Sequence, residues 1–403
     1  MDKQLFKKII KSYDYPLIIA VFLLSLFGLI MVYSASMITA VVRYHTASDY
    51  FFQKQKWALI LGTIAFLVTA FVPYKIYATK KVLQFIFFAL PISLILVILI
   101  GYTANNATSW FKIGSFGIQP AEFAKLGLIV YLSGVFANKQ KKLHHSAKDA
   151  LFPIYYMLFI CILIAAQPDF GTAFIIFVIA STIIVCSAIS KKLLFKQILF
   201  LLFLCLLASP FVLSVWWDEI FSEERLSRID GFLHPFEHAE DEGFQLINSY
   251  FAIANGGLKG LGLGQSIQKY GYLPEAHTDF IMAVIAEELG LFGVMFVLLL
   301  LSFIVLRGLL LARKCQDAFG SLLAIGISTM IAIQSFVNLG GLTGLIPITG
   351  VTLPFVSYGG SSLVLLMLSV GVLANISMFA KYELTYKRPS ARKNFQKNHV
   401  SFH

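Results

Sequence analysis

Long apolar runs alternate with short polar connections along almost the whole chain. Ten runs have about the length that a transmembrane helix needs, roughly 17–25 residues. They cover approximately residues 15–38, 56–74, 82–101, 119–136, 151–167, 170–189, 193–215, 279–307, 319–341 and 352–380. The pattern predicts an all-α polytopic membrane protein with about ten transmembrane helices. We expect one membrane domain over residues 15–380, preceded by a short segment, 1–14, and followed by a basic tail, 381–403.

Composition excludes a soluble globular protein. Of the 403 residues, 58% are hydrophobic and only 13% are charged, which is more apolar surface than a soluble core can bury. The first apolar run follows four lysines and lacks a small-residue cleavage site, so we expect a retained helix and not a signal peptide. The four cysteines have no paired spacing and lie in or beside apolar runs, which indicates buried single thiols.

Basic residues divide the polar connections into two sides. Most of the 32 Lys and Arg fall in the N-terminal segment, in every second connection and in the tail. Because cytoplasmic connections carry the excess of Lys and Arg, both termini are predicted to be cytoplasmic. The large loop 216–278, between the seventh and eighth helices, is then extracellular and holds ten of the 21 acidic residues. This distribution accounts for the net charge of +11, so no nucleic-acid partner is expected.

The largest polar island includes residues 243–293, and Asp279 lies where it gives way to an apolar run. A carboxylate at a membrane boundary loses part of its hydration, which raises its pKa toward the range of a useful general base. Two interpretations are open from the residues alone. Asp279 acts as a base, or Thr278 or Asp279 caps a helix that begins near Phe280.

Other ionisable residues lie inside or beside the predicted spans, where they are costly unless they are paired or face a polar cavity. Glu122 and Lys125 share a helical face and predict either a structural ion pair or a polar cavity that opens outward. Asp169 is equally suited to cap the following helix or to pair with Lys125. Of Glu287 and Glu288, at least one should face the protein interior.

Two glycine-rich segments interrupt the apolar pattern. Residues 256–264 lack the Gly-Lys-Ser/Thr ending of a nucleotide-binding loop, which favours close backbone packing or a re-entrant turn. This segment could also line a groove for a pyrophosphate group, helped by Arg225, Arg228 and Lys259. Residues 344–362 contain two prolines and several glycines, which predicts either a broken helix that lines a cavity or a kinked helix packed on its neighbours.

Together, several longer motifs resemble the SEDS family of bacterial membrane glycosyltransferases (shape, elongation, division and sporulation). The resemblance covers nearly the whole chain and rests on residues 33–36 (YSAS), 119–122 (QPAE), 168–171 (PDFG), 273–280 (LPEAHTDF) and 347–362. The last two motifs are the most specific. Residues 14–16, 50–57 and 283–290 look closer to the division branch than to the elongation branch.

The resemblance implies a peptidoglycan polymerase that joins lipid II units on the outer face of the cytoplasmic membrane during septal wall synthesis. Asp279 would be the catalytic base, and an inverting displacement of undecaprenyl pyrophosphate would form the β-1,4 bond. The residues implied on the substrate side are Lys125, Glu122, Arg225, Arg228, Lys259, His277, Glu275, Asp169, Ser357 and Ser361. No metal ligand is assigned and no cofactor is certain, although a divalent cation, Mg²⁺ or Mn²⁺, is left open. The implied partners are lipid II, a class B penicillin-binding transpeptidase and other divisome proteins.

The chain departs from the family pattern at two positions. Many relatives have Arg shortly before the Trp of the second outer loop, where this chain has Thr108-Ser109-Trp110, and some have Glu where this chain has Gln167. The rival functions are a lipid II flippase or other transporter, an elongation-type or sporulation-type polymerase, and a non-catalytic scaffold. A transporter predicts charged residues that continue across the membrane, whereas the charges here gather toward the outer boundary.

Overall fold

The computed structural model describes residues 3–104, 107–113, 116–138, 148–187, 230–241 and 243–387, together with positions 195 and 227. The described chain is mostly helical, as predicted. The helices long and apolar enough to span a membrane are α2 (Tyr15–Val42), α3 (Tyr50–Phe71), α4 (Lys80–Ile100), α5 (Pro120–Asn138), α12 (Ile281–Lys314), α13 (Ala318–Leu342) and α14 (Gly360–Tyr382). Two apolar helices are shorter, α7 (Lys148–Ala165) and α8 (Phe170–Cys186). The predicted span 193–215 and the first part of the outer loop lie outside the described residues.

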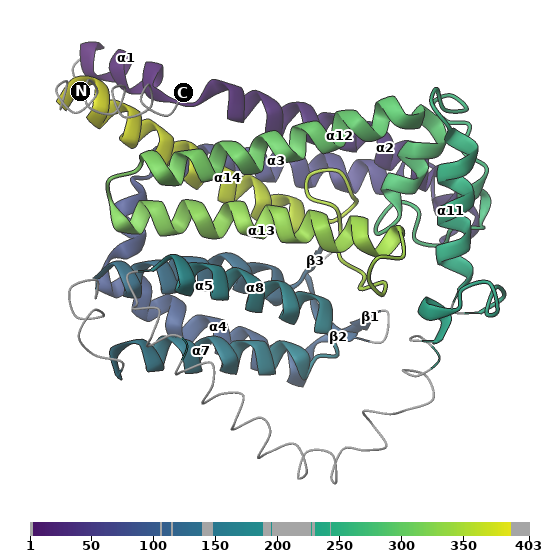
Figure 1. Cartoon of the computed structure of the whole chain (residues 1–403), viewed down its shortest axis with the longest axis horizontal. Coiled ribbons are helices and arrows are strands. Elements are labelled where there is room, and N and C mark those ends of the chain that lie inside the picture. The colour runs from purple at the N-terminus through teal and green to yellow at the C-terminus, as the bar shows by residue number, and fades with distance from the viewer. Residues whose placement is uncertain are drawn as a thin grey trace, which may run out of the picture.

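The long helices run side by side in one bundle (Figure 1). The amphipathic helix α1 (Lys3–Ser12) and the end of α14 lie together at one end, where the Lys381 ammonium group donates to the Lys11 carbonyl at 3.0 Å. Helix α11 (Phe244–Gly256) lies at the opposite end. The topology predicted from the charge distribution would put the α1 end in the cytoplasm and the α11 end outside.

Close packing of α3 on α14 shows how small and polar residues join membrane helices. A Cβ atom at Gly371 would lie 2.1 Å from the Thr69 hydroxyl oxygen, so only glycine allows this approach. Thr69 donates to the Leu368 carbonyl at 3.0 Å, and the Asn375 side chain donates to the Ala70 carbonyl at 2.6 Å. Helices in lipid gain little from hydrophobic burial against each other, so contacts of this kind carry the association.

A small antiparallel sheet follows α4, which the apolar pattern did not predict. It consists of β1 (Tyr102–Ala104), β2 (Ala107–Ile113) and β3 (Phe116–Ile118), in the order β1-β2-β3. Tyr102 lies opposite Trp110, and Phe111 lies opposite Ile118. Three strands of three to seven residues are too short for a periodicity signal beside long apolar helices.

Helix α12 is broken at Gly290, whose φ of 64° and ψ of −157° interrupt the helix one turn after Glu287. The preceding glycine segment, which turns after α11, supplies the missing hydrogen bonds. The backbone N–H of Leu261 donates to the Glu287 carbonyl at 2.9 Å, and the N–H of Gly262 donates to the Glu288 carbonyl at 2.9 Å. The N–H of Leu291 donates to the Gly257 carbonyl at 3.0 Å. The predicted close backbone packing of this segment is therefore confirmed.

Between α13 and α14, residues 344–359 form no regular helix, and α14 begins only at Gly360. The span predicted over residues 352–380 therefore begins eight residues before the first residue of α14. Gly344 and Gly350 have φ of 70° and 72°, values that an L-side chain rarely adopts. This irregular entry agrees with the broken-helix interpretation and not with a continuous kinked helix.

Candidate active site

Asp279 lies on a loop, residues 273–280, that leads directly into α12. The loop backbone is fixed from two directions. Within the loop, the N–H groups of Thr278 and Phe280 both donate to the Glu275 carbonyl at 3.2 Å. From α13, the side-chain amide of Asn338 donates to the Asp279 carbonyl and to the Val351 carbonyl, each at 2.8 Å. Asn338 therefore joins the Asp279 loop to the irregular segment before α14.

The Asp279 carboxylate is partly buried and accepts no hydrogen bond from the described part of the chain. A Cβ atom at Gly350 would lie 3.7 Å from its Oδ2. Burial raises the pKa of Asp279 from 3.8 to about 7, and the nearby Glu275 acts in the same direction. Helix α12 has no side-chain cap at its start, so neither Thr278 nor Asp279 caps it. The carboxylate is free to act as a proton acceptor near neutral pH.

His277, on the same loop, is 3% exposed. Its ring packs on Phe51 of α3, with centroids 4.4 Å apart, and on Tyr358 at 5.6 Å. Burial lowers the pKa of His277 to about 4, and the charge of Arg43 adds to that effect. The imidazole is therefore neutral at physiological pH and anchors the loop to α3.

Ser357 and Gln55 connect the loop to the remaining elements. Ser357 donates to the Thr278 carbonyl and accepts from the Leu353 N–H at 2.9 Å. Gln55 of α3 donates to the Ser357 carbonyl at 3.1 Å and accepts from the Gly359 N–H at 3.2 Å. Ser357 thus positions the backbone behind Asp279, and Ser361 lies buried in the first turn of α14.

Arg43, directly after α2, brings a cation to the Asp279 loop. Its guanidinium Nη1 lies 3.5 Å from Oε1 of Glu275, and its side chain is 52% exposed. Glu275 also accepts from the Thr278 hydroxyl at 2.8 Å. The sequence did not identify Arg43 as a site residue, because no motif ties a residue so distant in the chain to Asp279.

A second group of predicted residues lies between α5 and α8. The Lys125 ammonium group donates to Glu122 at 2.7 Å, and both side chains are buried, so the structure shows the ion pair, one of the two predicted alternatives. The other Glu122 oxygen, Oε2, has no hydrogen-bond partner in the described chain. Asp169 accepts from the Thr172 N–H at 3.0 Å, so it caps α8, and it also accepts from Gln119 at 2.9 Å. Asp169 was predicted either to cap the following helix or to pair with Lys125, and the hydrogen bond from Thr172 supports the cap.

Residues 349–351 lie close to Asp279 and to the start of α8. A Cβ atom at Gly171, next to the cap of α8, would lie 3.0 Å from Thr349 and 3.3 Å from Val351. Asp279 approaches the same segment at Gly350. The irregular entry to α14 therefore borders both Asp279 and the start of α8.

A buried network of charged and polar side chains, which the sequence did not predict, joins α12 to residues 266–269. Both Glu287 and Glu288 are fully buried, so the prediction that at least one faces inward is confirmed. Glu287 accepts from the Ser266 hydroxyl and from the Ile267 N–H at 3.2 Å. Glu288 accepts from the buried ammonium group of Lys269 at 2.9 Å. The need of two intramembrane glutamates for a partner was the signal that could have identified Lys269.

The remaining predicted cations lie apart or outside the described residues. Lys259 is exposed on the glycine segment, and Arg225 and Arg228 fall outside the described chain. No group of three His, Cys, Asp or Glu that could hold a metal ion occurs among the residues that the structure describes. The predicted divalent cation therefore has no matching ligand set there, and it stays a prediction.

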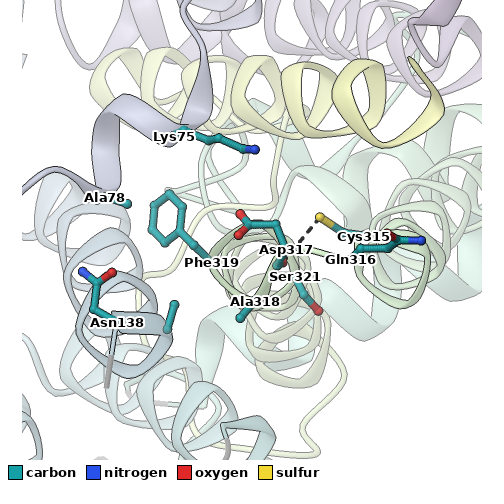
Figure 2. A pocket seen from close by; sticks show the side chains of 10 residues that line it. Lys75, Ala78, Asn138, Cys315, Gln316, Asp317, Ala318, Phe319 and Ser321 are labelled. Carbon is teal, nitrogen blue, oxygen red and sulfur yellow. Dashed lines mark hydrogen bonds between the residues drawn. The ribbon is translucent and has the colours of Figure 1, made fainter. Parts of the chain in front are cut away.

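A cavity of about 580 Å³ opens at the end of the bundle opposite the Asp279 loop. Figure 2 shows Lys75, Asn138, Asp317 and Phe319 around it. It lies beside the connection from α12 to α13, a full helix length from Asp279, and shares none of the predicted site residues. It is therefore not part of this candidate site.

Comparison with known proteins identifies the family. Residues 15–382 match the sequence model of the FtsW, RodA and SpoVE family, described as cell cycle protein. The chain belongs to this family. It is 55% identical over 396 residues to the probable peptidoglycan glycosyltransferase FtsW of Bacillus subtilis, covering 98% of each chain. It is 42% identical to the stage V sporulation protein E of the same organism, covering 92% of this chain and 98% of that one. These matches confirm the predicted enzyme class, a peptidoglycan glycosyltransferase, and an integral membrane protein.

Solved structures confirm the fold. The Thermus thermophilus rod shape determining protein RodA superimposes with a TM-score of 0.60 at 24% identity, covering 91% of this chain and 96% of that one. A second solved structure is a peptidoglycan synthase complex, described as coordinating polymerization and crosslinking. One of its chains superimposes with a TM-score of 0.68 at 24% identity, covering 91% of this chain and 98% of that one. At this level of identity the likeness supports the arrangement of helices and no residue role.

Proposed function

We propose that this chain polymerises lipid II into β-1,4-linked glycan on the outer face of the cytoplasmic membrane during septal wall synthesis, with Asp279 as the general base. The observation that carries the proposal is the state of the Asp279 carboxylate. It accepts no hydrogen bond from the described chain, its pKa is raised by burial to about 7, and its backbone is held by Asn338. A base poised near the working pH is the most effective acceptor of a proton from a sugar hydroxyl.

The reaction is one displacement. Asp279 takes the proton from the 4-hydroxyl of the acceptor GlcNAc as that oxygen attacks C1 of the donor MurNAc. The bond from C1 to the phosphate oxygen breaks, and undecaprenyl pyrophosphate leaves with the bonding electrons. Attack opposite the leaving group converts an α-linked donor into a β-1,4 bond. A single base is sufficient, in contrast to the two carboxylates of a retaining glycosidase.

Positive charge is needed where the pyrophosphate leaves. Arg43 is half-exposed beside the Asp279 loop, so it can reach a substrate phosphate without leaving a buried position. Lys259 is exposed on the neighbouring glycine segment, and Arg225 and Arg228 were predicted for the same role from the sequence. Lys125 is buried and paired with Glu122, which favours a structural role over direct contact with a phosphate. A bound Mg²⁺ or Mn²⁺ would supply further positive charge.

Kinship supports a transpeptidase partner and a septal location. The structural relative from a synthase complex belongs to an assembly that both polymerises and crosslinks. We infer that this chain works in the same way with a class B penicillin-binding protein and other divisome proteins. The higher identity to FtsW than to the sporulation protein favours division over sporulation.

The test is polymerisation of purified lipid II by the full chain in nanodiscs, with and without its transpeptidase, and analysis of the product. We expect glycan strands with β-1,4 bonds that muramidase degrades. Transport of lipid II across vesicles without any polymer would replace the proposal with the transporter function. Fluorescently tagged protein should concentrate at septa, and a uniform distribution along the cell would contradict the division role.

A further inference from the structure

The glycine loop, residues 257–272, carries an unusual row of exposed apolar side chains for an extracellular connection. Six of its large aliphatic and aromatic side chains are between 44% and 68% exposed. They are Leu258, Leu261, Leu263, Ile267, Tyr270 and Tyr272. An apolar surface of this kind on a water-exposed loop is unfavourable, so it needs a partner.

The depth of the loop can be measured along α12. Arg307 pairs with Asp14 at 2.7 Å, and Asp14 directly precedes the first apolar helix, so this pair marks the cytoplasmic boundary. Leu291 lies sixteen residues before Arg307, which is about 24 Å at a rise of 1.5 Å per residue. Because the Leu291 N–H bonds directly to the Gly257 carbonyl, the loop begins at this depth.

Helix α2 gives a second, independent measure. Ser34 accepts from the Lys269 ammonium group at 3.3 Å and lies nineteen residues after Tyr15, where α2 begins, or about 28 Å along the helix. The hydrocarbon core of a bilayer is about 30 Å thick. Both helices therefore place the loop at the outer edge of the hydrocarbon core, and any helix tilt places it deeper.

Charge along the chain agrees with contact to lipid. Residues 218–242 are rich in Asp and Glu, whereas residues 243–274 contain neither. Within the loop, Lys269 is buried and paired, and Lys259 is exposed. A loop with exposed lysine and tyrosine and without carboxylates suits the anionic headgroups of a bacterial membrane, while its leucines suit the acyl chains.

We propose that the glycine loop is an interfacial membrane anchor, with Leu258, Leu261 and Leu263 among the acyl chains of the outer leaflet. The loop closes the break at Gly290 of α12, and α12 begins two residues after Asp279. The lipid surface thereby fixes the depth of the candidate active site. This inference rests on burial, depth and charge and does not depend on the polymerase activity.

Nitroxide spin labels measure directly whether the glycine loop contacts lipid or water. We would place single cysteines at Leu261 and Leu263 in the full chain, with Cys161, Cys186, Cys205 and Cys315 replaced by Ala, in nanodiscs of phosphatidylethanolamine and phosphatidylglycerol. Leu299, 62% exposed on α12, provides the lipid reference, and Phe236, 71% exposed beside Glu237, provides the aqueous reference. Each label is then probed with oxygen, which concentrates in lipid, and with a water-soluble nickel chelate.

We expect labels at Leu261 and Leu263 to collide with oxygen as the Leu299 label does, with a loss of nickel collisions relative to the Phe236 label. Nickel collisions as frequent as at Phe236 would overturn the proposal. Shielding from both reagents would also overturn it, because protein and not lipid would then cover the loop. Leu258, which is 68% exposed, provides a third site if one variant fails to fold. Monodisperse elution of each labelled protein establishes that it is folded.

Discussion

The ammonium nitrogen of Lys269 lies 2.9 Å from Oε1 of Glu288, and neither side chain is exposed. Lys269 also donates to the Gly264 carbonyl at 2.7 Å, and Ser34 of α2 donates to both carboxylate oxygens of Glu288. One buried pair therefore ties α2 and the glycine loop to the same short stretch of α12 that begins beside Asp279. The pair acts on the site by holding this stretch in place.

Lys269→Met should leave the Glu288 charge buried and unpaired, which costs about 3–5 kcal/mol of the free energy of unfolding. Combining it with Glu288→Gln removes that charge, so the double variant should recover a large part of the loss. Chemical unfolding in detergent micelles measures both. Lys259→Met, a matched change at an exposed lysine of the same loop, should alter stability by less than about 0.5 kcal/mol. Equal effects at Lys259 and Lys269 would contradict the role of the pair.

Gly290→Ala should be strongly destabilising. A Cβ atom there would lie 2.5 Å from both the Gly260 nitrogen and the Leu258 carbonyl oxygen, and φ is already 64°. Backbone atoms cannot move aside as a flexible side chain can. Gly264→Ala is the control, because Gly264 has a similar φ of 83° with nothing within 4 Å, so only conformational strain of about 1–2 kcal/mol applies. Thermal unfolding distinguishes the two, and similar melting temperatures would argue against close packing of the loop on α12.

Asn338→Ala removes both hydrogen bonds that join the Asp279 loop to residue 351. At about 0.5–1.5 kcal/mol for each bond, we expect a loss of about 1–3 kcal/mol in stability. Polymerisation should fall more than this stability loss explains, because the position of Asp279 becomes less defined. Thr343→Ala, an exposed change near the end of the same helix, provides the control. Unchanged kcat in a folded Asn338→Ala variant would show that the loop is held by other contacts.

The polymerisation rate should rise with pH through about 7. Asp279 must be ionised to accept a proton, and burial raises its pKa to about 7. Below that value each pH unit should lower the rate about tenfold, because the ionised fraction falls tenfold. A pH series of single-turnover rates in nanodiscs measures this. A profile already flat above pH 5 would indicate a carboxyl group with an ordinary pKa.

The Asp279 carboxyl group also affects the free energy of unfolding. This free energy should fall as the pH rises, whereas the polymerisation rate should increase. The folded pKa of Asp279, about 7, lies above its ordinary value of 3.8, so the unfolded chain releases the proton first as the pH rises. The stability that the protonated form provides is complete below about pH 3.8 and is lost as the pH approaches 7. Asp279→Asn cannot ionise, so it should be more stable than the wild type at pH 8, by a margin that shrinks as the pH falls.

The sequence predicted the membrane helices well because lipid imposes a length and a composition on each span. For Glu122 and Lys125 it predicted either an ion pair or a polar cavity, and the structure shows the ion pair. It did not identify Arg43, Asn338 or Gln55, because their contacts join residues separated by tens to hundreds of positions. The sheet after α4 was missed for a different reason, since its strands are too short to produce a period.

The base assignment is tested most directly by comparing the wild type with Asp279→Asn in polymerisation of purified lipid II. The substitution is nearly isosteric and leaves the Asn338 contact with the main chain intact. We expect a loss of about 10²–10⁴-fold in rate in a variant that still folds and still binds the transpeptidase. Glu275→Gln, on the same loop, should retain far more activity. Equal polymerisation by the wild type and Asp279→Asn would contradict the account, because the proton acceptor would then lie elsewhere.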